Sequence, residues 1–88
     1  MDRREMIAYL EAKSPAAAIL VDDRIDSAME LLADFPDAGR LGQFEGTREL
    51  VIQDTPYIAA YRVETPAIVV LRLIHAARKW PESLPTAR

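Results

Sequence analysis

The chain has 88 residues, a formal net charge of −3 and no cysteine. This length suits one small domain, residues 1–88. Its hydrophobic core is expected to be small, so that binding of a partner could add to its stability. The lack of cysteine excludes a disulfide framework, a thiolate nucleophile and a cysteine zinc site. Because no signal peptide or transmembrane run is recognisable, we expect a cytoplasmic protein without metal or cofactor.

The charge is divided unevenly along the chain. Residues 1–39 carry four Lys or Arg against nine Asp or Glu, a net charge of −5, and residues 40–88 carry seven against five, a net charge of +2. An acidic surface repels nucleic acid, so any contact with phosphate must come from the second half. The mild total also argues against a broad, nonspecific nucleic-acid binder.

Two helices are predicted in the first half, at about 2–13 and 15–34. Ser14-Pro15 supplies an N-cap and a proline at the first position of the second helix. In that helix apolar residues recur at spacings of three and four, with acidic residues largely opposite them. We therefore expect an antiparallel helical hairpin with one face to bury. Its apolar positions are Met6, Ile7 and Leu10, followed by Ala18, Val21, Ile25, Ala28, Met29 and Leu32.

Phe35-Pro36 ends the second helix, and three glycines between 39 and 46 indicate a loop. Phosphate-binding loops follow a strand and open a helix, whereas this one follows a helix, so it is expected to be a connector. Three strands are predicted next, at about 47–53, 57–64 and 67–75, with links short enough for a meander. The expected fold class is α+β: the helical hairpin packed on a three-stranded antiparallel sheet, with a short C-terminal tail.

The strand register decides where the arginines lie. A three-residue first link would place residue 53 opposite 57 and bring Arg48 near Arg62. A second turn that pairs 64 with 68 would place Arg62 opposite Val70 and Arg72 opposite Ala60. The three arginines would then share one solvent-accessible face of the sheet. The opposite face, expected to pack on the helices, would carry Val51, Tyr57, Ala59, Tyr61, Val63, Val69, Leu71 and Leu73.

Four motifs in sequence order resemble the RelE/ParE toxins of bacterial type II toxin–antitoxin pairs. They are Pro36-Asp37-Ala38-Gly39-Arg40, Gly46-Thr47-Arg48-Glu49-Leu50, Tyr61-Arg62-Val63, and the run from His75 to Pro81. The resemblance implies a growth-inhibiting toxin, of a kind used in plasmid stabilisation, that is neutralised by a cognate antitoxin. Antitoxins of this family wrap the toxin with an extended, partly helical segment, and operator DNA would be contacted only through the antitoxin.

The two branches of this family differ in their target. In the RelE branch, basic residues on the sheet hold mRNA on the ribosome and help cleave it; Arg62 matches the arginine after the strand tyrosine, and Arg78 approximately matches the basic residue beyond the last strand. Where that branch places a tail acid–base group, this chain has Lys79-Trp80, and indole cannot exchange a proton. The tail looks closer to the ParE branch, so inhibition of DNA gyrase by protein binding is expected, with ribosome-dependent mRNA cleavage as the enzymatic alternative.

The resemblance and the basic pattern together give the candidate residues. Arg62, Arg78 and His75 are the catalytic candidates if the chain is a ribonuclease. Alternation places His75 on the core side of its strand, where a lone histidine is more often structural, and Trp80 is expected to anchor the tail on the sheet. Each arginine has a plainer interpretation, a solvated ion pair with Glu49, Glu64 or Asp54. The residues expected to contact the target or a phosphate are Arg48, Arg62, Arg72, Arg78 and Lys79.

The start of the chain departs from the family. RelE/ParE toxins open with a short strand and a linker, whereas Met1 is followed at once by helical sequence. This adds the alternative of a truncated, inactive toxin that still binds its antitoxin. A missing strand would leave a sheet edge on which a segment of another chain could add.

Overall fold

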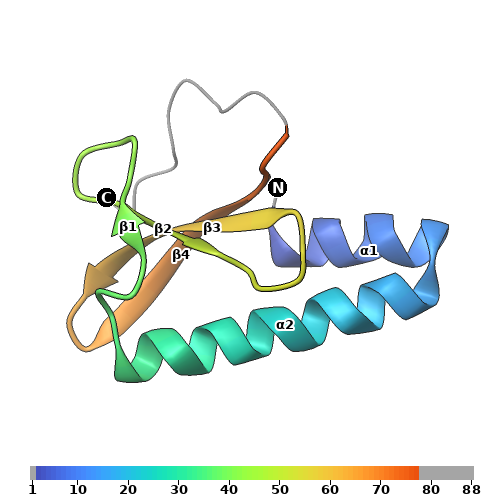
Figure 1. Ribbon diagram of the computed structural model, residues 1–88, viewed down its shortest axis with the longest axis horizontal. Coiled ribbons are helices and arrows are strands. Elements are labelled where there is room, and N and C mark those ends of the chain that lie inside the picture. Colours follow the sequence, from blue (N-terminus) through green and yellow to red (C-terminus); the bar gives the residue numbers. More distant parts are fainter. Residues whose placement is uncertain (1, 78–88) are drawn as a thin grey trace.

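The computed structural model describes residues 2–77. Helices α1 (Arg3–Lys13) and α2 (Pro15–Asp34) precede strands β1 (Arg40–Leu41), β2 (Arg48–Val51), β3 (Tyr57–Glu64) and β4 (Ala67–His75). The two helices form a hairpin on one side of an antiparallel sheet, with α1 beside the first half of α2 (Figure 1). The fold class is therefore α+β, as predicted. No helix among the described residues is long and apolar enough to cross a membrane.

Local capping sets the limits of both helices. The Asp2 carboxylate accepts a hydrogen bond from the Glu5 backbone N–H at 2.8 Å, and the Glu5 carboxylate accepts one from the Asp2 N–H at 3.2 Å. This capping box satisfies donors that have no partner within the helix. Ser14 then serves both helices: its N–H donates to the Leu10 carbonyl, and its Oγ accepts from the Ala17 N–H. One residue thus ends α1 and begins α2, which makes the hairpin tight.

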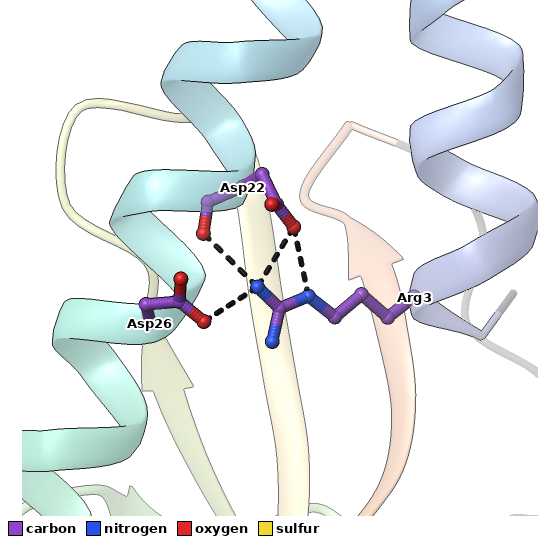
Figure 2. A network of polar contacts seen from close by, with 3 residues as sticks. All are labelled: Arg3, Asp22 and Asp26. Carbon is purple, nitrogen blue, oxygen red and sulfur yellow. Dashed lines mark hydrogen bonds and ion pairs between the residues drawn. The ribbon is translucent and has the colours of Figure 1, made fainter.

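Arg3 ties the two helices together at the open end of the hairpin. Its Nη2 lies 2.7 Å from Asp22 Oδ1 and 2.6 Å from Asp26 Oδ1, and its Nε donates to the same Asp22 oxygen at 3.0 Å (Figure 2). Partial burial acts to lower the pKa of this guanidinium, but the hydrogen bonds to Asp26 and Asp22 outweigh it and raise the pKa above its usual range. The guanidinium therefore stays charged and links α1 to successive turns of α2.

The core lies between the helical hairpin and one face of the sheet. Met6 of α1 and Ile25 of α2 are almost fully buried against Ala59 of β3 and Leu73 of β4. Burying one aliphatic side chain of this size contributes about 1.5–3 kcal/mol, so a few such residues supply much of the stability of a small domain. Several helix positions predicted from the spacing are buried, namely Met6, Ala18, Val21, Ile25, Ala28 and Leu32.

The sheet has four strands in the order β1–β2–β3–β4, not the three that were predicted. β1 is only two residues long and pairs Arg40 with Glu49 and Leu41 with Arg48. The Gly42 N–H donates to the Thr47 carbonyl at 2.8 Å and continues this pairing towards the loop. A two-residue strand has no alternation that could reveal it in the sequence, which explains why it was missed.

The predicted register between β2 and β3 is wrong by one residue. Arg48 pairs with Tyr61 and Val51 with Ile58, so Arg48 does not face Arg62. The cause is the turn: the Ile52 N–H bonds to the Tyr57 carbonyl, which leaves four residues in the link instead of three. Within that link Asp54 adopts a left-handed conformation, with φ of 62°, which aspartate tolerates better than most residues. A shift of one residue reverses the face on which a side chain lies.

Between β3 and β4 one predicted pair is confirmed although the turn differs. Glu64 pairs with Ala67 and Arg62 with Val69, one residue away from the expected pairs. A β-bulge between Ala60 and Tyr61 then changes the register, so that Arg72 lies opposite Ala60 as predicted.

These registers assign each strand residue to one of two faces. Tyr57, Ala59 and Leu73 belong to the core cluster that includes Val21 and Ile25, so their face is the helix side of the sheet. We call the opposite side the outer face. Val51 and Val69, which were expected on the helix side, lie on the outer face because they pair with Ile58 and Arg62.

Candidate functional site: the outer face of the sheet

A row of paired residues crosses all four strands on the outer face. Arg40 pairs with Glu49, Glu49 with Ala60 and Ala60 with Arg72. Paired residues in neighbouring strands lie on the same side of a sheet, so the row places an arginine at each edge and a carboxylate between them. Arg72 is exposed, as expected.

Glu49 is the acidic centre of this row and is only 7 % exposed. Its Oε1 accepts from Arg40 Nε at 3.0 Å, and its Oε2 accepts from the Gln43 backbone N–H at 2.8 Å. A carboxylate can be buried at low cost only when its charge and lone pairs are satisfied in this way. Glu49 therefore holds Arg40 and the β1–β2 loop in place, and neither of its oxygens is left without a partner.

Arg62 lies beside the row on β3. Its Nη2 pairs with the Glu64 carboxylate, its side chain is 17 % exposed, and its Nε is buried without a hydrogen-bond partner. Arg62 and Arg72 share the outer face, because Ala60 lies two residues from Arg62 on β3 and pairs with Arg72. Arg62 is thus less accessible than predicted, and its predicted ion pair with Glu64 is present.

Arg48 lies on the other side of the sheet and does not join these arginines. It pairs with Tyr61, whose face is the helix side, and its Nη1 donates to the Gly39 carbonyl at 2.8 Å. Its Nε lies 3.5 Å from Asp37 Oδ1. The expectation that Arg48, Arg62 and Arg72 form one face is therefore wrong, and the contacts of Arg48 support the loop before β1.

The same loop is held by a buried hydroxyl. Tyr61 is 0 % exposed, and its hydroxyl donates to the Pro36 carbonyl at 2.7 Å and accepts from the Gly39 N–H at 3.0 Å. A Cβ atom on Gly39 would lie 2.7 Å from the Tyr61 ring, so glycine is required at this close approach. Tyr61 and Gly39 together fix the direction in which the chain enters β1, and so the position of Arg40.

His75 lies away from the arginines, on the helix side at the end of β4. It pairs with Tyr57 and makes an edge-on ring contact with it, with ring centroids 5.4 Å apart. Its Nδ1 accepts the Ala77 backbone N–H at 3.1 Å. Nδ1 is therefore occupied by the backbone of the segment that follows β4.

The remaining sequence candidates, Arg78, Lys79 and Trp80, lie outside the described residues. Within residues 2–77 no group of three or more His, Asp or Glu side chains could hold a metal ion. Arg40 is the site residue that the sequence reasoning missed. The signal was present in the motif Pro36 to Arg40, but only the pairing with β2 shows that Arg40 shares a face with Arg72.

Comparison with known proteins shows that the chain is similar to toxins of toxin–antitoxin systems. Residues 1–80 match the family described as the ParE toxin of the type II toxin–antitoxin system parDE. The protein "Putative toxin Y4kP" of Sinorhizobium fredii is 42 % identical over 80 residues, which are 91 % of this chain and 82 % of that protein. The protein "Toxin RelE2" of Caulobacter vibrioides is 37 % identical over 70 residues, 80 % of this chain and 77 % of that protein.

The chain therefore belongs to the RelE/ParE family and, within it, matches the ParE toxins of type II toxin–antitoxin systems. This confirms the class inferred from the four motifs. A toxin of this class has an antitoxin as its partner.

Proposed function

We propose that this toxin inhibits DNA gyrase by protein binding and is neutralised by a cognate antitoxin. The observation that carries the proposal is the position of His75, the imidazole among the catalytic candidates in the described residues. It lies on the helix side of the sheet, with Nδ1 occupied by the Ala77 N–H. A group that takes up a proton during cleavage must reach the reacting hydroxyl, and His75 does not face the arginines.

The carboxylates on the outer face support the same proposal. Glu49 is held by Arg40 and the Gln43 N–H, and Glu64 is paired with Arg62. Both carboxylates therefore already have partners within the protein. The outer face therefore suits recognition better than proton transfer, because it offers the exposed side chains of Arg40, Val51 and Arg72 to a protein surface.

The antitoxin is proposed to cover the helical hairpin and one edge of the sheet. β4 is the last strand of the described sheet and is nine residues long, so it offers a long edge of backbone groups to an added strand. Two shallow hollows share Met29 and flank β4: Val70 and Leu71 line one, and Val63 and Ile68 line the other. Alternate apolar side chains of an added segment could fill them.

The test compares the two possible targets directly. Purified toxin is added to gyrase in a supercoiling assay and, separately, to translating ribosomes followed by mapping of transcript ends. Inhibition of supercoiling with intact mRNA is expected, and antitoxin should reverse it. Codon-position cuts in mRNA that disappear in an Arg62→Ala variant would refute the gyrase proposal.

The enzymatic alternative is a ribosome-dependent mRNA endonuclease. The observation that favours it is the presence of Arg62 and Arg72 on one face, since guanidinium groups stabilise charge that develops on a phosphate. A third alternative, an inactive toxin that retains antitoxin binding, predicts no effect in either assay from a folded protein that still binds its antitoxin.

A further inference from the structure

The outer face of the sheet holds two isoleucines that are buried although the helices lie on the other side. Ile58 of β3 pairs with Ile74 of β4, and both lie on the outer face because side chains alternate along a strand and Tyr57 and Leu73 belong to the core. Ile58 is 6 % exposed and Ile74 is 7 % exposed. The side of an antiparallel sheet that faces water normally carries polar side chains. We call these two residues the isoleucine pair.

The described part of the chain does not account for this burial. Both helices pack on the opposite side of the sheet (Figure 1). The loop between β1 and β2 reaches the outer face at Glu49, which accepts the Gln43 N–H and pairs with Ala60, two residues along β3 from Ile58. Val51 pairs with Ile58 but is 56 % exposed, so the cover does not extend fully over β2. The isoleucine pair is therefore covered from the β4 side, where the chain leaves the sheet.

The chain beyond β4 starts close to this pair and is long enough to cross the sheet. The Ala76 N–H donates to the Pro56 carbonyl at 2.8 Å, so the chain is still beside the start of β3 when it reaches Ala77. Eleven residues, 78–88, follow. An extended chain spans about 3.3–3.6 Å per residue, so eleven residues reach at most about 36–40 Å. Four strands about 4.8 Å apart measure only about 14 Å across.

The sequence of this segment supplies a suitable cover. Trp80, the one tryptophan of the chain, follows Ala77 by three residues, which span at most about 10 Å. It can lie over the isoleucine pair if the chain turns back directly after β4. A tryptophan side chain buries about 150–250 Å², enough to cover two neighbouring aliphatic residues. Pro81 and Pro85 reduce the conformational entropy that the segment would lose on ordering.

We propose that residues 78–88 fold back over the outer face and that Trp80 covers the isoleucine pair. The pair is buried in a single copy of the chain, so neither a second copy nor another protein is needed to cover it. The apolar half of the outer face is then closed by the protein itself, whereas Arg40 and Arg72 stay exposed. Arg78 and Lys79 precede Trp80 directly, so they add positive charge to the same face. The inference does not depend on which target the toxin inhibits.

The test uses Trp80 as a fluorophore in the full-length protein. The chain has no cysteine, so one cysteine can be introduced and labelled with a nitroxide, which quenches tryptophan only at short range. Val51→Cys places the label on the outer face beside Ile58, and Ile19→Cys is the matched control on α2, behind the sheet. Both positions are more than half exposed, so labelling should leave the fold intact. Quenching should be several-fold stronger at position 51 than at position 19, and urea should abolish the difference.

A mixing experiment separates contact within one chain from contact between two copies. Val51→Cys is combined with Trp80→Phe, labelled, and added to unlabelled wild-type protein. The fluorescence of the wild-type protein should not change, because the label and the tryptophan are now on different chains. Quenching in this mixture would place the segment of one copy on the sheet of another and would overturn the inference.

A variant without the tryptophan tests the cover itself. Trp80→Ser in the full-length chain should lower the Tm in a circular dichroism melt and increase binding of the dye ANS, because the isoleucine pair becomes exposed to water. Arg88→Ser, at the end of the same segment, is the control and should melt as wild type does.

Three further outcomes would overturn the inference: equal quenching from positions 51 and 19, a Trp80 emission maximum that does not move to longer wavelength in urea, or a Trp80→Ser variant that melts and binds dye as wild type does. A wild-type toxin that leaves supercoiling by gyrase unaffected counts against the gyrase proposal alone, because the quenching experiment involves no target.

Discussion

Replacing Tyr61 by phenylalanine removes one hydroxyl from the core and tests how the loop before β1 is held. That hydroxyl bonds to the Gly39 N–H and the Pro36 carbonyl, and Gly39 is buried. Leaving a buried donor without a partner costs about 1–3 kcal/mol. The Pro36 carbonyl is only partly buried, so water can replace the hydroxyl as its donor. Losing this second hydrogen bond therefore adds less to the destabilisation. We expect a total destabilisation of about 2–3 kcal/mol.

For a domain of this size, 1 kcal/mol changes the Tm by about 4–8 °C, so Tyr61→Phe should lower the Tm by roughly 10 °C or more in a circular dichroism melt. Tyr57→Phe is the matched control in the same strand. The Tyr57 hydroxyl has no hydrogen-bond partner among the described residues, and its removal should cost less than about 0.5 kcal/mol. Equal melting curves for the two variants would refute the assignment of Tyr61 as the residue that fixes this loop.

Three further predictions concern charged residues. Arg3→Met should destabilise the protein by about 1 kcal/mol in urea titrations, and by less in high salt, because a partly exposed ion pair is screened. The backbone hydrogen bond from Glu5 lowers the pKa of Asp2 below 3.8. The contribution of the Asp2 carboxylate to stability is therefore present above pH 3.8 and is lost as the pH falls through the lowered pKa. In the Asp2→Asn variant, the free energy of unfolding should change less with pH over this range. Arg72→Ala should weaken growth inhibition while changing stability by less than about 0.5 kcal/mol, whereas Arg62→Ala should reduce both, because Arg62 is largely buried.

Much of the fold could be predicted because local signals decide it. Ser14-Pro15 marks the boundary between the helices, and the spacing of apolar residues in α2 identifies the side that is buried. Each of these signals acts within a few residues. The helix boundary and the buried side of α2 can therefore be predicted without knowledge of contacts between distant parts of the chain.

The arrangement of the site could be predicted only in part, because it depends on the length of each turn. One additional residue in the link before β3, with Asp54 in the left-handed conformation, moves Arg48 to the helix side. The predicted pairing at the second turn was wrong by one residue, so the predicted partner of Arg62 was also wrong by one residue. The bulge in the β3–β4 pairing cancels this difference further along the strands, so the predicted partner of Arg72 was correct. Neither the turn length nor the bulge has a strong signature in the local sequence.

That bulge also predicts which deletions the family could accept in β4. Ala60 pairs with Arg72 and Tyr61 with Val70, so Leu71 is the residue that has no partner in the pairing. Removing Leu71 alone would join the two halves of the hairpin into one regular ladder and keep every existing pair. Removing a residue further from the bulge would turn over the residues between the deletion and the bulge, and would direct a guanidinium or a leucine to the wrong side. Natural variation in the length of this strand should therefore be concentrated at the bulge.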